Sequence, residues 1–263
     1  MTKWLILFRK EWLEMIRSYK IVWLPISFIV LGASQPIATY FMPDILSSAG
    51  NMPEGAIISL PTPKPFEVLA SSLQQFGVIG LLLIALSNMS ALSLERSSGT
   101  AAMILVKPVS FVSFVTAKWA AILSLSMVSF LFGYSAAWYY TIALFDSVRW
   151  LEVLLSAMLF ALWLGFVGTL ALMFSSLIRS AAAAAFSALA TAALLSIVSS
   201  TLPFKQVWNP GRLPTLAAGS LDTAQHINNS SLSVWLTAIV TAVAIAIALV
   251  IATGSMRSRP SDV

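Results

Sequence analysis

The sequence predicts an all-α membrane protein with six transmembrane helices, an N-terminal amphipathic helix and a short helix between the second and third spans. Two observations lead to this fold class. Of the 263 residues, 59% are hydrophobic and only 10% are charged, and the mean hydropathy is +0.90, whereas a soluble domain carries roughly a quarter charged residues. The apolar residues also gather into six long stretches without charges. We therefore interpret residues 1–263 as a single transmembrane domain.

Each apolar stretch is long enough to hold the roughly 20 residues that cross a bilayer as a helix. Helices are expected because no stretch alternates with a period of two and each is far longer than the roughly 10 residues of a barrel strand. A signal peptide is the rival interpretation of the first stretch, but its charged leader is too long and Pro36 breaks any small-residue cleavage pattern. The expected spans are residues 21–42, 69–94, 119–142, 153–178, 181–202 and 233–255.

The basic residues predict the orientation, because Lys and Arg gather on the cytoplasmic side of membrane proteins. With the N-terminus inside, only four of the 15 basic residues lie outside, namely Lys64, Arg149, Lys205 and Arg212. We therefore expect both termini in the cytoplasm. The basic residues are spread over short loops and span ends, so the net charge of +5 does not indicate a nucleic-acid partner. The remaining basic residues, all on the expected inner side, are Lys3, Arg9, Lys10, Arg17, Lys20, Arg96, Lys107, Lys118, Arg179, Arg257 and Arg259.

The segment 3–20 precedes the first span and has the pattern of an amphipathic helix. Its apolar residues fall within an arc of about 120° at helical spacing, and its charged residues occupy the remainder. Aromatic rings suit the membrane interface and basic side chains suit anionic headgroups, so we expect this helix to lie on the inner leaflet. A simple juxtamembrane anchor is the alternative. The apolar arc consists of Trp4, Phe8, Trp12, Met15, Ile16 and Tyr19.

The composition excludes several kinds of active site. The chain has no cysteine and one histidine, so thiolate or imidazole metal clusters and cysteine nucleophiles are ruled out. It contains no phosphate-binding loop, dinucleotide fingerprint or zinc-binding helix motif. The expected spans also contain no charged residue in their interiors, which argues against an ion-coupled carrier. The candidate acids Glu95 and Glu152 fall on opposite faces of the membrane. Any energy that this chain uses is therefore expected to come from another protein.

Two further features concern packing and connections. The fourth span contains Gly165 and Gly168, and the fifth opens with a run of alanines. Such small residues let helices approach closely in lipid, either within one subunit or at a contact between subunits. The outer loop before the last span is expected to include a short re-entrant or interfacial piece.

The segment between the second and third spans predicts a short helix outside the membrane, over residues 97–108. Gly99 permits a sharp change of direction, Thr100 suits a helix N-cap, and Pro108 prevents continuation beyond Lys107. The helix carries the apolar run Ala101–Val106, and an exposed apolar face usually has a partner.

This segment resembles the permeases of type-2 ATP-binding-cassette exporters. The resemblance rests on Glu-x-x-x-Gly-Thr, an apolar run, Lys-Pro-Val-Ser and Lys-Trp, and it extends to the N-terminal "FRKEWLEMIRSYK" and to six spans with both termini inside. Many family members have a basic residue after Pro-Val-Ser, whereas this chain has Phe111. The matching positions are Glu95, Gly99, Thr100, Pro108, Val109, Ser110 and Lys118.

The resemblance implies a bacterial cell-membrane exporter subunit that moves an amphipathic lipid, peptide or antimicrobial. Two cytosolic ATPase subunits would bind ATP and Mg²⁺, this chain would hold no cofactor, and a second permease copy or paralogue and membrane lipids would be its other partners. The 97–108 helix would be the coupling helix, and the N-terminal helix the elbow. The implied coupling residues are Glu95, Gly99, Thr100, Met103, Ile104, Leu105, Lys107 and Pro108, and the elbow residues are Trp4, Phe8, Arg9, Lys10, Trp12 and Arg17.

Two other classes of function compete with this interpretation. A membrane-embedded regulator or scaffold could use the 97–108 helix to bind a cytosolic signalling protein. An intramembrane enzyme is the third hypothesis. The sequence does not identify the substrate or the residues that contact it.

Overall fold

Helices form every regular element in the part of the chain that the structure describes. The computed structural model describes residues 3–48, 63–89, 91–93, 110–201, 208–222 and 231–258. The long helices are α1 (Lys3–Arg17), α2 (Lys20–Ser48), α7 (Phe111–Leu144), α8 (Trp150–Leu177), α9 (Ala181–Thr201) and α12 (Ser231–Ser258). The shorter elements are α3 (Pro65–Gln75), the π-helical turn η1 (Phe76–Gly80), α4 (Leu81–Asn88), the 3₁₀ turn η2 (Pro210–Arg212) and α10 (Leu213–Gly219).

The prediction of an all-α protein with six membrane spans is confirmed. Six helical segments are long and apolar enough to cross a membrane, and each overlaps one of the expected spans. Their ends differ most at the third span, which was expected from 119 and begins at Phe111. The six segments are Lys20–Leu46, Pro65–Asn88, Phe111–Leu144, Trp150–Leu177, Ala181–Thr201 and Leu232–Arg257.

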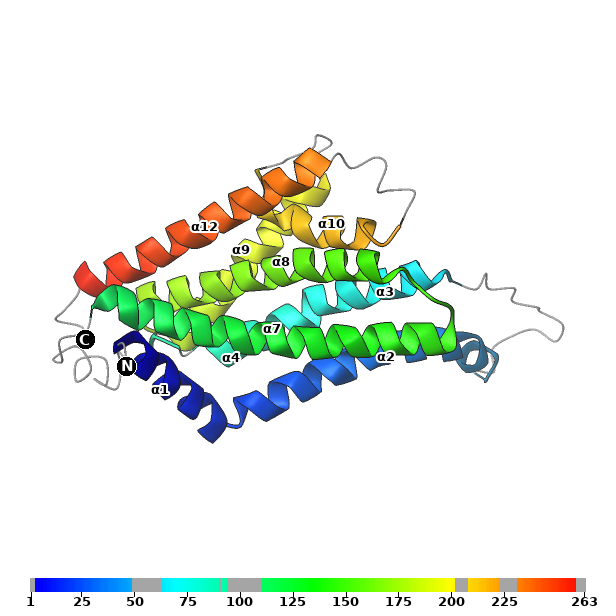
Figure 1. The fold of residues 1–263 in the computed structure, drawn as a ribbon, viewed down its shortest axis with the longest axis horizontal. Helices are drawn as coiled ribbons and strands as arrows, with labels where there is room; N and C mark the ends of the chain where they lie inside the picture. The colour runs from blue at the N-terminus through cyan, green and yellow to red at the C-terminus, as the bar shows by residue number, and fades with distance from the viewer. Residues whose placement is uncertain are drawn as a thin grey trace.

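α8 is the central helix of the bundle. In its most apolar window 72% of the residues are buried, against 22% for α2 and α9 and 17% for α12. The helices α4, α7, α9, α10 and α12 all pack against it. α2 packs along α7 on one side, while α12 and α9 lie on the other (Figure 1). The peripheral helices therefore present most of their apolar side chains outward, as expected in lipid.

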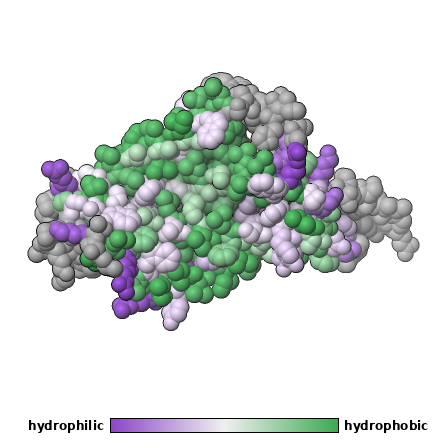
Figure 2. Space-filling view, in the orientation of Figure 1, coloured by the Kyte–Doolittle hydropathy of each residue, from purple (hydrophilic) through white to green (hydrophobic). Residues whose placement is uncertain are grey.

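The bundle has two polar ends and an apolar middle. Hydrophilic side chains gather toward both ends of the long axis, and hydrophobic ones cover the stretch between them (Figure 2). The start of α1 and the end of α12 lie at the same end of the bundle, as six crossings require (Figure 1). We call this the α1 end. Which side of a membrane it faces stays a prediction.

The helices α2 and α7 approach each other closely at two glycines. A Cβ atom added to Gly32 would overlap the carbonyl oxygen of Gly133, and one added to Gly133 would overlap the backbone of Phe28. By contrast, Gly165, singled out in the sequence, lies against the side chains of Leu123 and Met127 within the same subunit. Gly32 and Gly133 thus provide the close contact that small residues allow in lipid.

An aromatic cluster fills the space beside this contact. Phe76 stacks on Phe28 at a centroid distance of 5.6 Å and meets Phe130 edge to face at 5.6 Å. Phe130 in turn stacks on Tyr134 at 5.5 Å and on Phe160 at 5.2 Å. These offset and edge contacts are the arrangements that aromatic rings prefer. The cluster joins α2, η1, α7 and α8 into one core.

A short helical segment precedes the last span, where a re-entrant or interfacial piece was expected. It consists of η2 and α10, and its apolar side chains pack against α8, α9 and α3. Asn209 anchors it, donating from Nδ2 to the carbonyl oxygen of Leu195 at 2.9 Å and accepting from the Gly211 N–H at 2.8 Å. The segment is therefore part of the bundle and not a solvent-exposed connection.

Candidate functional site

The predicted coupling residues fall in a stretch that lies outside the described residues. Glu95, Gly99, Thr100, Met103, Ile104, Leu105, Lys107 and Pro108 all belong to 94–109, and their roles stay predictions. The structure does describe both flanks of this stretch and the helix beside it. The candidate site is therefore built from α1, the end of α4, residues 91–93, and the first turns of α7.

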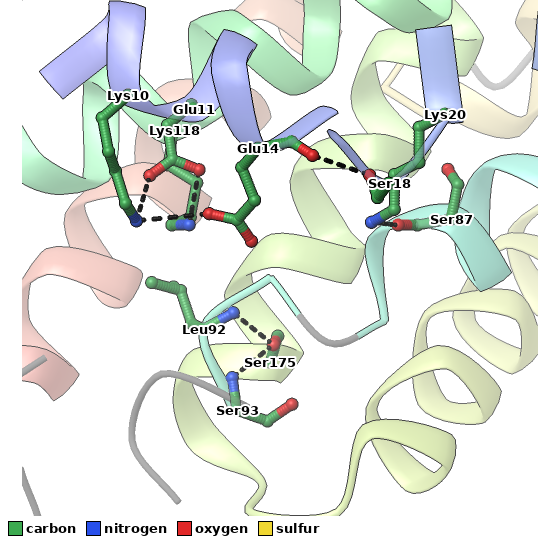
Figure 3. A network of polar contacts seen from close by, with 10 residues as sticks. All are labelled: Lys10, Glu11, Glu14, Ser18, Lys20, Ser87, Leu92, Ser93, Lys118 and Ser175. Carbon is green, nitrogen blue, oxygen red and sulfur yellow. Dashed lines mark hydrogen bonds and ion pairs between the residues drawn. The ribbon is translucent and has the colours of Figure 1, made fainter. Parts of the chain in front are cut away.

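Ser175 of α8 fixes the chain where it enters the 94–109 stretch. Its hydroxyl oxygen accepts hydrogen bonds from the backbone N–H groups of Leu92 and Ser93, each at 3.0 Å (Figure 3). The same hydroxyl donates to the carbonyl oxygen of Met89 at 3.2 Å. The last turns of a helix leave backbone groups without partners, and here a neighbouring span supplies one. The entry to 94–109 is thus attached to the central helix.

Ser110 fixes the chain where it leaves the same stretch. It is the N-cap of α7, and its hydroxyl accepts from the Ser113 N–H at 3.1 Å. This matches the preference of helix N-termini for serine. The residues that flank 94–109 on both sides therefore take part in side-chain hydrogen bonds, to α8 on one side and within the first turn of α7 on the other.

α1 packs its aromatic side against the first turns of α7. The indole Nε1–H of Trp4 donates to the Thr116 hydroxyl at 3.2 Å. Trp4 stacks on Phe8 at 5.4 Å, and Phe8 contacts Trp12 at 6.2 Å. All three aromatic residues are half-buried. The apolar arc predicted for this helix is therefore partly used in contact with α7, which an anchor lying alone on the membrane would not require.

A buried ion pair joins the same two helices. Nζ of Lys118 in α7 lies 2.6 Å from Oε2 of Glu11 in α1, and the two residues are 2% and 5% exposed. Lys10 Nζ lies 2.9 Å from the other carboxylate oxygen and 3.3 Å from Glu14 Oε2 (Figure 3). α7 begins at Phe111 and carries Lys118 inside it, so the helix starts before the expected span at 119. Glu11 balances the charge of Lys118.

The charge state of Glu11 follows from this geometry. Burial alone would raise the pKa of its carboxyl, because a low dielectric disfavours the ionised form. The ammonium groups of Lys118 and Lys10 outweigh burial, so the pKa of Glu11 lies below its usual value of 4.5. Glu11 is therefore ionised at neutral pH. Such a pair favours one relative position of the two helices, because moving them apart would separate two buried opposite charges.

A second polar contact lies at the junction of α1 and α2. Tyr19 has a positive φ of 56°, in the left-handed region, and turns the chain sharply between the two helices. Directly after it, Lys20 donates from Nζ to the carbonyl oxygen of Ser87 near the end of α4 at 2.6 Å (Figure 3). The start of α2 is thus connected to the second span, and the middle of α1 is connected to the third.

The implied elbow residues divide into two groups. Trp4, Phe8 and Trp12 lie on the side that packs against α7, whereas Arg9 and Arg17 are exposed and Lys10 takes part in the ion-pair network. Leu5, Ile6, Leu13 and Ile16 form the exposed apolar part of the helix. That this part lies in the membrane interface stays a prediction. A helix with one side against α7 and another apolar side exposed can touch both the bundle and lipid.

Sequence reasoning placed Glu11 on the polar side of the helix and did not assign Thr116 or Ser175 a role. The sequence did contain a sign that Glu11 lies near the packed side of the helix. It lies three residues after Phe8 and four before Met15, both in the apolar arc, and residues at these spacings are neighbours on a helix. The partner Lys118 is 107 positions away and could not be identified from local spacing. Within the described ranges, no group of three or more acidic, His or Cys side chains could hold a metal ion.

Comparison with known proteins gives a family but no activity. No protein-family profile matches the chain. The chain is 36% identical over 207 residues to the "Uncharacterized transmembrane protein YxlG" of Bacillus subtilis (strain 168), covering 79% of this chain and 80% of the relative. The relative's description as a transmembrane protein agrees with the six apolar helices. This chain therefore belongs to the same family as YxlG, a family of multi-pass transmembrane proteins.

Proposed function

We propose that this chain is the permease subunit of an ATP-binding-cassette exporter, which couples ATP hydrolysis in a separate cytosolic ATPase to export or extraction of an amphipathic substrate. The observation that carries the proposal is the attachment of α1 to the first turns of α7 through Glu11–Lys118 and Trp4–Thr116. In sequence, the first turns of α7 directly follow the stretch that resembles a coupling helix. The attachment supports a permease in which a partner's push at the α1 end of the bundle moves α1 and α7 together.

The mechanism follows from how the parts are connected. A partner that pushes on 94–109 would act on residues 91–93 and on the start of α7. Ser175 would pass the displacement to α8, and the buried ion pair would make α1 move together with α7. Packed helices respond to such a push by rigid-body movement between discrete arrangements. With two permeases and two ATPases, that movement would open the path between the permeases alternately to the two sides.

The first experiment is to purify the tagged chain gently from membranes of its native host and to identify the proteins that accompany it by mass spectrometry. We expect an ATPase subunit in about a one-to-one ratio. Leu105→Asp is expected to release it, because a charge would disrupt an apolar docking face. Leu232→Asp, in an exposed position of α12 at the opposite end of the bundle, is the matched control and should retain the ATPase. Retention by both variants would refute the coupling role of Leu105.

The regulator or scaffold hypothesis gives a different result in the same experiment. It would be supported by recovery of a signalling protein without any ATPase, including after crosslinking, and that outcome would exclude the exporter. An intramembrane enzyme would be supported if substitution of a single buried polar residue abolished an activity and left assembly intact. The contacts of α1 with α7 favour the exporter, because neither alternative requires an N-terminal helix attached to the helix that follows 94–109 in sequence.

A further inference from the structure

One partly buried cation stands apart from the other basic residues that the structure describes. Four basic side chains in the described ranges are buried or half-buried. Three of them, Lys10, Lys20 and Lys118, have Nζ atoms that lie 2.6–2.9 Å from an oxygen atom. The fourth is Arg212 of η2, whose guanidinium makes no hydrogen bond or ion pair with the described residues.

The guanidinium of Arg212 lies partly inside the protein and partly at its surface. Nη1 is the one of its three nitrogens that is fully buried without a partner. Arg212 as a whole is half-buried, so Nε and Nη2 are the atoms that a ligand at the surface can reach. All of these N–H groups can only donate hydrogen bonds. The side chain is therefore oriented by the protein and open to an acceptor from outside.

The charge of Arg212 is not balanced by the described part of the chain. Burial lowers the pKa of Arg212, and no carboxylate or hydrogen-bond acceptor among the described residues opposes this effect. An arginine nevertheless stays protonated in proteins. Partly buried charges normally have a partner, because leaving water without one is costly. An anion from outside this part of the chain would supply that partner.

The backbone that carries Arg212 is fixed to the bundle. Asn209 donates to the carbonyl oxygen of Leu195 at 2.9 Å and accepts from the Gly211 N–H at 2.8 Å. A Cβ atom at Gly211 would overlap the same carbonyl, so η2 sits directly on α9. η2 also packs against α12. A cation on such a rigid support loses little conformational freedom when it binds a ligand.

Arg212 lies near one end of the membrane-spanning region. Leu195, to which η2 is attached, is six residues before Thr201, where the apolar segment of α9 ends. Six residues of an α-helix are about 9 Å long. Because the α9 segment of 21 residues just spans a hydrocarbon core about 30 Å thick, η2 lies close to the boundary between hydrocarbon and headgroups.

Exposed aromatic side chains mark the same boundary. Tyr139 of α7, Trp150 of α8, Trp208 before η2 and Trp235 of α12 are between 59% and 69% exposed. They belong to the end of the bundle opposite the α1 end (Figure 1). Tyrosine and tryptophan are enriched at the level of the lipid headgroups. A guanidinium at this level has phosphate groups within reach.

We propose that Arg212 binds the phosphate of an anionic phospholipid, such as phosphatidylglycerol, in the membrane leaflet at this end of the bundle. Phosphate oxygens accept hydrogen bonds from Nε and Nη2, a planar pair of donors that suits them. A zwitterionic headgroup brings its own cation and would leave the charge of the site unbalanced.

The surroundings of the site favour a lipid over a free anion. η2 packs against α12, whose outward side carries exposed apolar residues such as Leu236 and Ile239. The acyl chains of a lipid bound at Arg212 would lie along this side, whereas a free phosphate would gain nothing from it. Lipid binding by this chain does not depend on the exporter proposal.

The test is native mass spectrometry of the full chain in detergent with equal amounts of phosphatidylglycerol and phosphatidylcholine. We expect the first bound lipid to be phosphatidylglycerol. Arg212→Gln removes the charge, so binding of this lipid should weaken about tenfold, the lower end of the range for a hydrogen bond to a charged group. Arg149→Gln is the matched control and should not change binding, because Arg149 lies at the same end, is 77% exposed and has Glu152 at 3.6 Å.

A second variant and a competitor separate the remaining explanations. Arg212→Lys keeps the positive charge and should retain most of the bound lipid, with unchanged thermal unfolding. A loss as large as in Arg212→Gln would overturn the role of the charge. Equal binding of the two lipids by the natural chain, or equal losses in Arg212→Gln and Arg149→Gln, would overturn a specific site for an anionic lipid. Displacement of the lipid by excess inorganic phosphate would assign Arg212 to a free anion instead and overturn the lipid proposal.

Discussion

At the scale of single residues, the Glu11–Lys118 pair is the feature with the largest consequence for stability. Both side chains are buried and their charged atoms lie 2.6 Å apart. Removing one partner from a buried pair typically costs about 3–5 kcal/mol of the free energy of unfolding. We expect Glu11→Gln to lower the midpoint of thermal unfolding in detergent by several degrees. Glu14→Gln should have little effect, because Glu14 is exposed and lies 3.3 Å from Lys10.

The pH dependence of the same pair provides the control. Because the pKa of Glu11 is lower in the folded protein than its ordinary 4.5, the pair contributes fully above pH 4.5. This contribution falls as the pH drops below 4.5 and is lost once the pH passes below the lowered pKa of the folded state. The difference in unfolding midpoint between the natural chain and Glu11→Gln should therefore shrink in acid. A difference that stays constant from pH 7 to pH 3 would contradict this assignment of the ionised pair.

At the scale of elements, the contact of α2 with α7 depends on two glycines facing each other. We expect Gly32→Ala to destabilise the protein by about 1–3 kcal/mol, because the new methyl group must push α2 away from the carbonyl of Gly133. Chemical unfolding in mixed micelles would measure this change. Gly254→Ala adds the same group where no atom lies within 4 Å, and it should be neutral or slightly stabilising. Equal stability of the two variants would refute the close contact.

The elements also show how far the sequence alone predicts this fold. The six spans could be predicted because bilayer thickness fixes the length of an apolar helix. The start of α7 could not, since Lys118 ended the apolar stretch and its counter-charge lies 107 residues earlier. The π-turn at Phe76–Gly80 and the packed α10 segment were not anticipated in detail, because both depend on neighbouring helices.

At the scale of the whole molecule, the open question is which side of the membrane the α1 end faces. The exporter proposal requires the cytoplasmic side, because a cytosolic ATPase must reach residues 94–109. The distribution of basic residues predicts that side. Because the natural chain contains no cysteine, a single introduced cysteine reports its own position. Ser147, between α7 and α8, and Ser180, between α8 and α9, are exposed and lie at opposite ends of the bundle.

We expect Ser147→Cys to react with a membrane-impermeant maleimide in intact cells, and Ser180→Cys to react only after the membrane is permeabilised. Both changes replace one hydroxyl by a thiol of similar size at an exposed position, so each is the control for the other. The opposite labelling pattern would place 94–109 outside the cell, and the exporter proposal would then fail whatever proteins accompany the chain. The expected pattern would place the attachment of α1 to α7 where a cytosolic ATPase can act on it.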